Sequence, residues 1–318
     1  MVLSKGKVNM NEIKCIFCGI GSDNVVINEN GYTGRKCSRC GLIYISPRPS
    51  FDNIVDLYAL DNAHLSAQSH ISCDFLKRLY ARHNLNIIQS FVKSGSLLEL
   101  GAGAGYFLDE ARKIGFIPQG VEFNSILANY IRNTLKIPCE ESLLNTPVFK
   151  GKQFDVVYHC DVVSHLYDPI SDFKKINEMM KDNAFLIFET GNFGEIDQVY
   201  FKHIERFQYP EHLFLFSTDN LIDLLNKTGF KFMKMYKYSI LPQLLATKAL
   251  AGAKNLIKKC ILESKENEER VETYKTTVKE GIRNINYYCN YLLRYKVGSI
   301  IPKAHRPQTV IVVAKKSK

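Results

Sequence analysis

Short β-like runs alternate with helical stretches from Ser96 to about Ser239, and this alternation limits the fold more than any other feature of the sequence. Strands separated by helix-length segments run parallel, because the crossover helix returns the chain to the edge where the previous strand began. The sequence therefore predicts an α/β fold with a parallel sheet covered by helices. The predicted strands are Leu97–Leu100, Ile117–Val121, Phe154–His159, Ala184–Glu189 and Phe230–Tyr238, and the predicted helices are Tyr106–Ile114, Ser125–Leu135, Ile170–Met180 and Thr218–Thr228.

Three further regions flank this alternating part. Residues 1–50 contain cysteine pairs and Gly-rich turns, and they predict a small module of turns and strands. Residues 51–95 have apolar side chains near helical spacing and predict a helical linker packed on the next domain. Residues 241–306 predict two long helices, followed by a last strand at Thr309–Lys315. Because that strand follows the helices, we expect one α/β domain over residues 96–318 with a helical insertion.

The composition is that of an ordinary globular protein. The 318 residues are 46% hydrophobic and 23% charged, and no run approaches the roughly 20 apolar residues that a membrane helix needs. The first 14 residues lack the apolar stretch of a secretory signal, so we expect a cytoplasmic protein. The formal charge of +10 would suit a nucleic acid or a membrane, but residues 241–306 contain 13 Lys and Arg against 6 Glu. Most of the excess charge thus belongs to one late segment.

Four of the nine cysteines form two pairs, Cys15-Ile-Phe-Cys18-Gly and Cys37-Ser-Arg-Cys40-Gly, with 18 residues between the pairs. This spacing is typical of zinc sites, because one tight turn aims two thiolates at a tetrahedral ion and the following glycine accepts the backbone conformation of the turn. Two disulfides or free thiols are the alternative, and a reducing compartment disfavours disulfides. With four sulfur ligands, a zinc ion would be structural and not catalytic.

The strand at Leu97–Leu100 runs into Gly101-Ala-Gly103-Ala-Gly105 and then into a helix. Such a turn lets a ligand touch backbone N–H groups at the helix N-terminus. A dinucleotide fingerprint needs a third glycine at the position of Tyr106, and no Gly-Lys-Ser/Thr is present for a nucleoside triphosphate. Glu99 and Glu122 flank the loop, and Glu122 stands where an open α/β sheet places the acid that binds ribose hydroxyls. Two carboxylates suit a phosphate-free ligand with ribose and positive charge, and S-adenosylmethionine fits this description.

At these residues the sequence resembles the class I S-adenosylmethionine-dependent methyltransferases, in particular those that begin with a four-cysteine zinc module. The likeness covers nearly the whole chain and rests on the order and spacing of its motifs. They are the two cysteine pairs followed by Pro47-Arg48-Pro49, Glu99–Gly105, Gly120-Val-Glu122, Phe154-Asp-Val-Val157, Ser164-His165-Leu-Tyr-Asp-Pro169, Glu211-His212-Leu and Phe216-Ser217. The resemblance implies a Rossmann-like sheet of seven strands, with a short third strand near Ile137–Cys139 and an antiparallel last strand.

The resemblance also implies which residues contact the cofactor. Residues around the ends of the first and fourth strands match positions at the methionine end. They are Glu99, Gly101, Ala102, Gly103, Gly105, Cys160 and Asp161. Residues after the second and third strands match positions at the adenosine end, where an acid binds the ribose and its neighbours cover the adenine. They are Glu122, Phe123, Ser142 and Leu143.

Methyl transfer from a sulfonium is an in-line displacement that needs acceptor and methyl about 3 Å apart in a dry pocket, and a hydroxyl acceptor also needs a base. His212 and His165 are candidates, because imidazole titrates near neutral pH and both lie in loops expected at the carboxyl ends of the strands. Glu211 and Tyr209 are further candidates. A loop histidine bonded to backbone is the alternative for His165. The family commonly has an acid before this histidine, whereas this sequence has Ser164.

The basic insertion has Tyr287, Tyr291 and Tyr295 at every fourth position. Its singled-out cations are Lys254, Lys258, Lys259, Arg283, Arg294 and Lys296. Aromatic rings beside cations stack on bases and neutralise phosphates, which would suit RNA. The alternatives are an amphipathic helix whose tyrosines pack on the domain or on a second subunit, and a lid over an anionic small substrate.

The sequence therefore predicts a cytoplasmic S-adenosylmethionine-dependent methyltransferase with a structural zinc module. The resemblance implies a small or carrier-linked acceptor, such as a nucleotide-linked sugar or a polysaccharide precursor, with oxygen as the methylated atom. Two alternatives stay open. One is an RNA methyltransferase that docks through the zinc module and the insertion, and the other is a non-catalytic cofactor-binding protein, because the acid is absent at Ser164.

Overall fold

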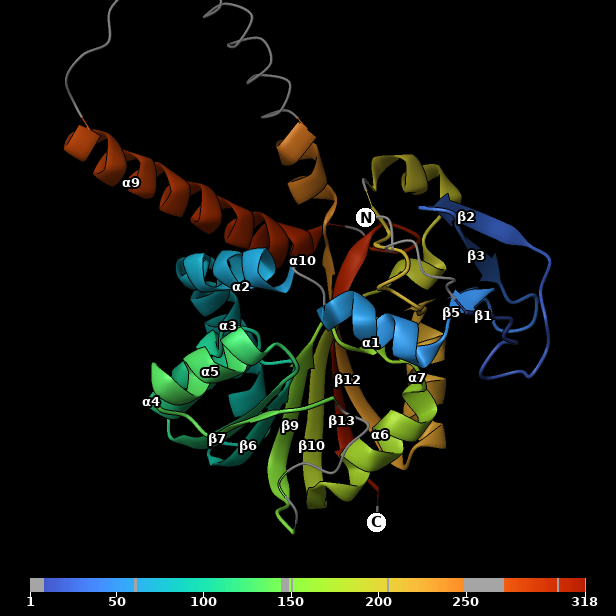
Figure 1. Cartoon of the computed structure of the whole chain (residues 1–318), viewed down its shortest axis with the longest axis horizontal. Coiled ribbons are helices and arrows are strands. Elements are labelled where there is room, and N and C mark those ends of the chain that lie inside the picture. Colours follow the sequence, from blue (N-terminus) through green and yellow to red (C-terminus); the bar gives the residue numbers. More distant parts are fainter. Residues whose placement is uncertain are drawn as a thin grey trace, which may run out of the picture.

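A seven-stranded sheet forms the centre of the computed structural model (Figure 1). The structure describes residues 9–59, 62–143, 149, 151–204, 206–248, 272–301 and 303–317. The strands of the sheet are β6 (Gly95–Leu100), β7 (Phe116–Glu122), β8 (Cys139–Glu141), β9 (Phe154–Cys160), β10 (Met180–Gly191), β12 (Phe230–Ser239) and β13 (Gln308–Lys316). They lie in the order β12-β13-β10-β9-β6-β7-β8. The predicted Rossmann-like fold class is thereby confirmed.

The directions of the strands show where the carboxyl ends of the parallel strands meet. β13 is antiparallel to β10 and β12, as the resemblance implies, and the remaining pairs are parallel. The implied third strand is present as β8, two residues later than expected. Because β6 lies between β7 and β9, the carboxyl ends of these three strands meet at one edge. Open α/β sheets bind their ligands in the crevice at such a point.

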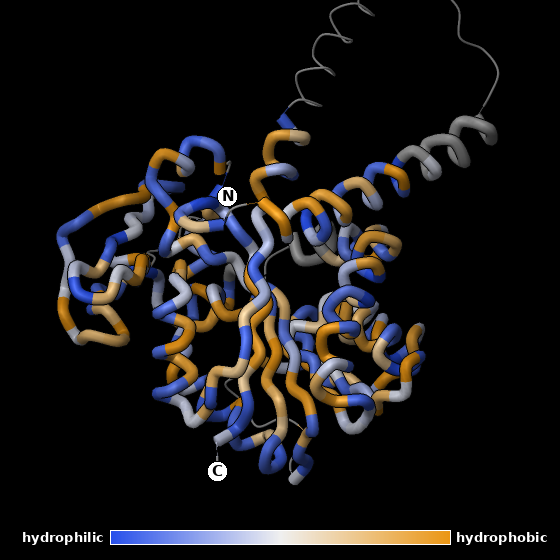
Figure 2. The backbone as a smooth tube through the Cα atoms, turned by 180° about the vertical axis from the view of Figure 1, so that it is seen from behind, coloured by the Kyte–Doolittle hydropathy of each residue, from blue (hydrophilic) through white to orange (hydrophobic). Residues whose placement is uncertain are grey.

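Helices cover both faces of the sheet and bury their apolar sides against it. One face carries α3 (Asp74–Gln89), α4 (Tyr106–Lys113) and α5 (Ser125–Asn133), and the other carries α6 (Pro169–Glu178) and α7 (Thr218–Lys227). Successive strand residues alternate between the two clusters, as Leu97 and Leu98 do. Figure 2 shows apolar residues along the central strands. The connecting 3₁₀ turns are η1 (Val163–His165), η2 (Phe193–Glu195) and η3 (Gln198–His203).

The predicted helical linker is three helices and not one continuous element. α1 (Phe51–Ala59) and α2 (Asn62–Ser72) precede α3, and a turn at Cys73 interrupts the helix between α2 and α3. The break lets α2 cross over the start of α4, where the Tyr106 hydroxyl donates to the carbonyl of Ile71 at 2.7 Å. Contacts with the domain thus decide where this helical region bends.

The described part of the N-terminal module forms two small antiparallel sheets, one of two strands and one of four strands that includes a strand from the main domain. The module strands are β1 (Met10–Asn11), β2 (Val25–Glu29), β3 (Tyr32–Lys36), β4 (Ile43–Ile45) and β5 (Arg48–Pro49). β1 pairs with β5, whereas β11 (Phe214–Leu215) pairs with β4 and completes the order β11-β4-β3-β2. Buried residues of β4 and β11 share one hydrophobic cluster with α6 and α7. The boundary at residue 50 stays a prediction, but the core is continuous across it.

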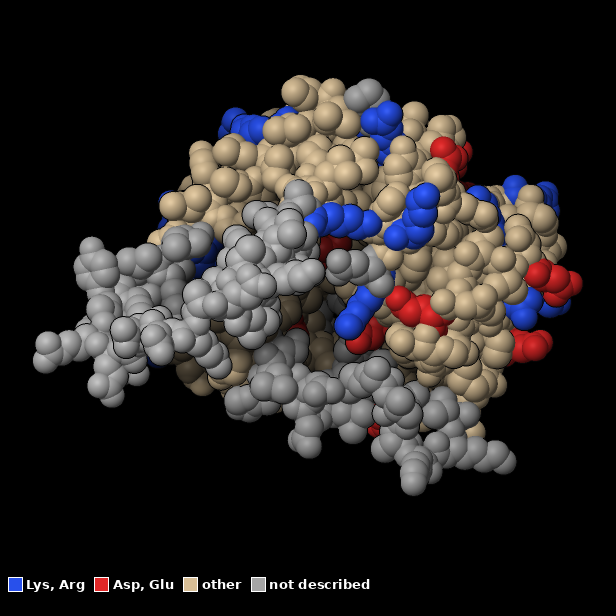
Figure 3. Space-filling model, turned by 90° about the horizontal axis from the view of Figure 1, so that it is seen from above, with Lys and Arg blue, Asp and Glu red and all other residues tan. Residues whose placement is uncertain are grey.

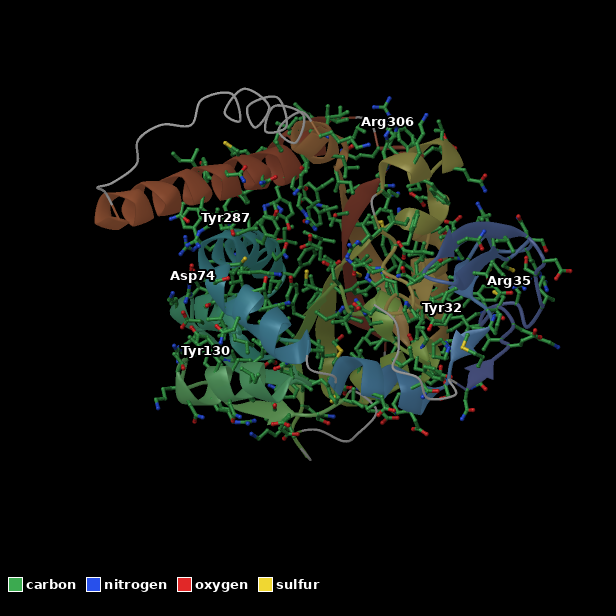
Figure 4. All side chains as sticks on the ribbon, turned by 45° about the horizontal axis from the view of Figure 1, so that its top comes forward. Tyr32, Arg35, Asp74, Tyr130, Tyr287 and Arg306 are labelled. Carbon is green, nitrogen blue, oxygen red and sulfur yellow. The ribbon has the colours of Figure 1, made fainter. Side chains whose placement is uncertain are left out.

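The described part of the insertion is helical. Residues 241–248 form a helix, and α9 (Glu272–Tyr291), the π-helical η4 (Leu292–Val297) and α10 (Gly298–Ile300) precede β13. α9 extends away from the sheet and packs on α3 (Figure 1). Figure 4 shows Tyr287 near Asp74, and the Tyr287 hydroxyl lies 3.5 Å from Cys73 Sγ. Lys254, Lys258 and Lys259 lie outside the described residues. None of the helices in the described part combines the length and apolar character of a membrane span.

The segment η4 buries an ion pair against the sheet. Arg294 Nη2 lies 2.6 Å from Glu189 Oε1, and the Tyr295 hydroxyl donates to the same carboxylate at 2.8 Å. The Tyr295 ring stacks on His83 with centroids 3.9 Å apart, and Tyr291 contacts the same imidazole edge-on. Two consecutive residues of this π-helical segment, Arg294 and Tyr295, thus contact one carboxylate. Tyr291 and Tyr295 therefore pack on the domain.

Replacing Phe214 with Ala should destabilise the module and the domain together. Phe214 is fully buried in the strand that joins them, and such a truncation costs about 3–5 kcal/mol of unfolding free energy. Urea unfolding followed by circular dichroism should show one transition, shifted to lower urea. Phe75→Ala, at a side chain that is 37% exposed, should change the free energy by about 0.5 kcal/mol or less. Two separate transitions would contradict the shared core.

Candidate active site

A cavity of about 710 Å³ opens at the edge of the sheet where β6, β7 and β9 end. Its walls come from α1, α2, α3, the glycine loop, the residues directly after β7, β8 and β9, and Gln208 and Glu211. Figure 3 looks onto the corresponding end of the molecule and shows a hollow with side chains of both charges near its rim. The cavity therefore lies at the point where this sheet topology favours ligand binding.

The glycine loop has the backbone conformation that its sequence predicts. Gly101, Gly103 and Gly105 have φ angles of 67°, 55° and 75°, which residues with a Cβ rarely adopt. Gly101, Ala102 and Gly103 line the cavity. Gly105 does not line it and instead caps α4, where a Cβ would lie 2.6 Å from Cγ1 of Ile131. Gly105 thus allows α4 and α5 to pack closely.

Glu122, at the end of β7, holds the glycine loop in place. Its Oε2 accepts the N–H of Gly103 at 2.7 Å, and its Oε1 accepts the N–H of Asn124 at 2.8 Å. Burial raises the pKa of Glu122, and hydrogen bonds from backbone N–H groups partly offset that effect. Because a carboxylate has further lone pairs, Glu122 can also accept hydrogen bonds from a ligand in the cavity that it lines.

Glu99, on β6, is a buried carboxyl group that faces the cavity. Only 5% of the residue is exposed, and no group in the described part of the chain bonds its Oε2. Burial raises the pKa of Glu99 well above its usual value, and the neighbouring Glu122 raises it further. An unpartnered buried carboxyl group is costly. The site therefore favours a ligand that brings a hydrogen-bond donor with positive charge.

The other predicted cofactor-binding residues surround the same space. Asp161 follows β9 in a left-handed conformation with φ of 55°, and its N–H donates to the carbonyl of Glu189 at 2.9 Å. Burial raises the pKa of Asp161, although Arg294 opposes this shift. Cys160, Phe123, Ser142 and Leu143 line the cavity as well. Every predicted cofactor-binding residue except Gly105 thus lines one cavity.

Two of the four predicted catalytic residues, His165 and Glu211, line the cavity. The His165 ring hydrogen-bonds with the backbone of Glu211. Burial, with the nearby His212, lowers the pKa of His165 to about 3, so its imidazole is neutral at pH 7. Burial raises the pKa of Glu211. A neutral imidazole and a carboxyl group of increased basicity therefore share one wall.

His212 and Tyr209 are placed differently, because neither lines the cavity. The His212 ring lies edge-on to the His165 ring, with centroids 4.5 Å apart. Tyr209 is buried on the module side, where a Cβ added to Gly34 of β3 would collide with its hydroxyl group. Their catalytic roles stay predictions, and the observed contacts are those of supporting residues.

One face of α3 supplies cavity residues that the sequence analysis did not single out. Lys77, Tyr80, Ala81 and Asn84 line the cavity, and their spacing of three and four residues puts them on one side of the helix. Lys77 has no ion-pair partner among the described residues, although it lies close enough to lower the pKa of Glu99. A Lys and an Asn at helical spacing were the available signal in the sequence.

The four paired cysteines form a compact cluster. Their sulfur atoms all lie within 4.8 Å of one another. The two pairs have the same backbone turn, in which the N–H of Gly19 donates to Cys15 and the N–H of Gly41 donates to Cys37. Burial opposes ionisation of Cys37, but N–H groups of Cys40 and Arg39 lower its pKa to about 7. This geometry suits four thiolate ligands around one ion.

Comparison with known proteins decides the family. A family model described as a methyltransferase domain matches residues 60–234, a range that includes the glycine loop, Glu122, His165 and Glu211. The chain belongs to this methyltransferase family. Together with the fold, the match makes it an S-adenosylmethionine-dependent methyltransferase. No curated protein matches the sequence.

Two solved structures show how widely the fold of this methyltransferase occurs. One is in the complex that contains the Trm112 methyltransferase activator of Haloferax volcanii, with 12% identity, a TM-score of 0.50, and coverage of 83% of this chain and 98% of that chain. The other is phosphoethanolamine N-methyltransferase 2 of Haemonchus contortus, solved with S-adenosylhomocysteine, with 14% identity, a TM-score of 0.50, and coverage of 87% of this chain and 63% of that chain. At this identity the likeness shows the fold alone.

Replacing Glu99 with Gln in the methyltransferase should weaken S-adenosylmethionine binding by about 10- to 100-fold, because a charge-assisted hydrogen bond is lost. Because burial raises the pKa of Glu99 and so favours its protonated form in the free protein, binding of a cationic ligand should favour release of a proton and should weaken as pH falls. Calorimetry in buffers of different ionisation enthalpy measures both effects. Glu141→Gln, at an exposed carboxylate, is the matched control and should change neither.

The raised pKa of Glu99 also predicts the direction in which Glu99→Gln changes the stability of the folded protein. A carboxyl group whose pKa is raised by folding stabilises the protein below its unfolded pKa, and this stabilisation is lost as pH rises through the folded value. The free Glu99→Gln protein should therefore be more stable than the wild type at pH 7. Unchanged affinity and unchanged stability in this variant would contradict the assignment of Glu99.

Proposed function

We propose that this methyltransferase methylates a hydroxyl oxygen of a small or carrier-linked metabolite, with a sugar ring as the acceptor. The observation that carries the proposal is that His165, Gln208 and Glu211 line the same cavity as the apolar side chains of Phe51 and Ile54. We call these five residues the acceptor wall. A sugar ring has an apolar face and hydroxyl groups that need hydrogen-bond partners. Such a ring suits a wall of apolar surface with a few convergent polar groups.

The residues present fit S-adenosylmethionine, which supplies an electrophilic methyl group when bound. Glu99 and Asp161 provide negative charge for its ammonium and sulfonium groups. Glu122 is placed for the ribose hydroxyls, and Phe123, Ser142 and Leu143 line the side that would hold the adenine. Lys77, a cation from α3 that has no ion-pair partner within the described part of the chain, would bind the carboxylate of the methionine end.

Glu211 is the proposed general base. A hydroxyl group loses its proton as its oxygen attacks the methyl carbon, so a basic group must lie within hydrogen-bond reach. Burial raises the pKa of Glu211, whereas the pKa of His165 is lowered to about 3, which makes the imidazole the weaker base. His165 would orient the acceptor hydroxyl, with the His212 ring packed against its own.

The charge of the lining indicates which part of the acceptor enters. Asp161, Asp172 and Glu211 line this region, and Lys77 is the one Lys or Arg among the described lining residues. A phosphate group would be repelled by these carboxylates. We therefore infer that a neutral sugar enters the cavity, and that the anionic part of a nucleotide-linked acceptor stays outside it.

The described residues do not support the two alternatives, an RNA methyltransferase and a non-catalytic cofactor-binding protein. Arg294 and Tyr295 bind the buried Glu189 carboxylate, so they are not free to contact RNA. The sequence lacks the family's acid at Ser164, but the backbone of Glu211 hydrogen-bonds His165, and both residues line the cavity. A carboxyl group and a histidine therefore line one cavity, which favours catalysis over mere cofactor binding.

Methylation of a hexose tests the proposal directly. Labelled methyl transfer from S-adenosylmethionine should be measured to a nucleoside diphosphate hexose, the corresponding methyl hexoside, and an amino-hexose analogue. Glu211→Gln should lower kcat by about 100-fold or more, in line with the loss of a general base, and leave the affinity for S-adenosylhomocysteine unchanged. In the wild type, kcat should fall as pH drops through the raised pKa of Glu211, because the base must be ionised.

The matched control for this test is Glu178→Gln, at an exposed carboxylate of α6, which should behave as wild type. Transfer to the amine and not to hydroxyl groups would show that the acceptor atom is nitrogen. An unaltered pH profile in Glu211→Gln would show that another group is the base.

We also propose that Cys15, Cys18, Cys37 and Cys40 bind one structural zinc ion. The purified protein should contain about one zinc ion per chain, as four-thiolate sites do. Cys18→Ser should lose the metal and expose residues below 50 to protease, because so small a module has too little apolar core to fold by itself. Cys289→Ser, at an exposed cysteine, should retain the metal. If the metal-free protein resisted protease below residue 50 as well as the wild type does, the zinc assignment would be wrong.

A further inference from the structure

Residues at the turn between β2 and β3 hydrogen-bond to the segment 206–213, which contains Gln208 and Glu211 of the acceptor wall. Glu29 Oε1 accepts the N–H of Phe207 at 2.9 Å, and its Oε2 accepts the N–H of Tyr209 at 2.6 Å. The side-chain amide of the next residue, Asn30, donates to the carbonyl of Tyr209 at 2.8 Å. We call Glu29 and Asn30 the hairpin latch. It fixes a segment that lies almost 180 residues further along the chain.

The residue between the two gripped N–H groups is Gln208, which has a left-handed φ of 64°. Two N–H groups on either side of such a residue form a concavity that suits an anion, and the Glu29 carboxylate fills it. The Gln208 side chain lines the cavity. The backbone carbonyl of Gln208 accepts the N–H of Glu211 at 2.8 Å and that of His212 at 3.0 Å. The conformation of Gln208 therefore determines how the next turn presents Glu211.

Further contacts join the module to the same wall. The Arg48 guanidinium donates to the carbonyl of Tyr167 at 3.0 Å and lies 3.8 Å above its ring, and Tyr167 lines the cavity. Gly34 leaves room for the Tyr209 hydroxyl group, which a Cβ would displace. Figure 4 shows Tyr32, on β3, at the boundary between module and domain, and its side chain packs on the shared core.

We propose that the N-terminal module is part of the acceptor site, and that Glu29 is a positioning residue for methyl transfer. It holds Gln208 and, through it, Glu211 in the arrangement that the acceptor meets. The statement about the acceptor rests on the proposed function, whereas the latch is defined by hydrogen bonds alone. The cofactor side is held by other contacts, such as Glu122 with the N–H of Gly103. The latch should therefore affect the acceptor wall and leave cofactor affinity intact.

Two substitutions weaken the latch in different ways. Glu29→Gln keeps the size of the side chain but loses its charge and one of its two acceptor oxygens. Gly34→Ala leaves Glu29 and Asn30 unchanged, but its new Cβ on β3 would collide with the Tyr209 side chain and displace the residue that the latch holds. Asp23→Asn, at an exposed carboxylate of the module, and Gly21→Ala, where a Cβ meets nothing within 4 Å, are the matched controls.

The first measurement is amide hydrogen exchange of the segment 206–213 in the full chain with S-adenosylhomocysteine bound. Exchange at Phe207 and Tyr209 should become about tenfold faster in Glu29→Gln, as expected when charge-assisted hydrogen bonds are lost. Peptides that contain the glycine loop should be unchanged, and calorimetry should give the same affinity for S-adenosylhomocysteine. The two control variants should match the wild type in both readouts.

The second measurement is methyl transfer to the nucleoside diphosphate hexose. Both latch variants should lower kcat/KM for the hexose by about tenfold and leave KM for S-adenosylmethionine unchanged. Unaltered exchange at Phe207 and Tyr209 would overturn the inference, and so would an equal loss of affinity for S-adenosylhomocysteine. The exchange readout needs no acceptor. If the wild type methylates no hexose, the proposed acceptor class fails, and exchange together with cofactor affinity still decides the latch.

Discussion

The burial of two carboxyl groups beside the glycine loop is the constraint on which the site depends. Glu99 and Glu122 lie where parallel strands end, and burial raises the pKa of both. Glu122 is compensated by backbone N–H groups of the loop, whereas one oxygen of Glu99 has no partner among the described residues. The free protein therefore carries an uncompensated polar group that a cationic ligand can satisfy. Cofactor preference and loop geometry follow from the same pair of residues.

The acceptor side is built on a different principle, because its residues come from segments that only tertiary contacts bring together. His165 follows β9, while Gln208 and Glu211 precede β11, the strand that completes the module sheet. The N–H of Leu213 donates to the backbone carbonyl of Ser164 at 2.7 Å, and the N–H of Ile45 donates to the backbone carbonyl of Leu213 at 3.1 Å. The module, the segment 206–213 and the turn at His165 thus form one hydrogen-bonded unit. A module that could be read as an appendage is a structural part of the cavity wall.

The glycine loop, its acids and the alternation of strands and helices were predictable because each is encoded within a few residues. Periodicity gave six of the seven sheet strands to within a few residues, whereas β8 was implied only by the family resemblance. Gly101 and Gly103 take the positive φ angles that their residue type permits. The bend at Cys73, the pairing of β11 with β4 and the union of Glu189 with Arg294 were not predictable in this way. The last of these joins residues 105 positions apart, and neither sequence segment shows which charge it will meet.

By itself, the sequence determined the class of the sheet, the shape of the loop and the tight turns of the two cysteine pairs, because dihedral preferences and hydrophobic spacing act over short stretches of chain. Tertiary structure alone decided that one face of α3 brings Lys77 and Asn84 to the cavity. It also decided that Glu211, and not Tyr209, faces the cavity beside His165. The physical reason is that burial and long-range hydrogen bonds set both the direction and the pKa of a side chain, and these exist only once distant segments have packed.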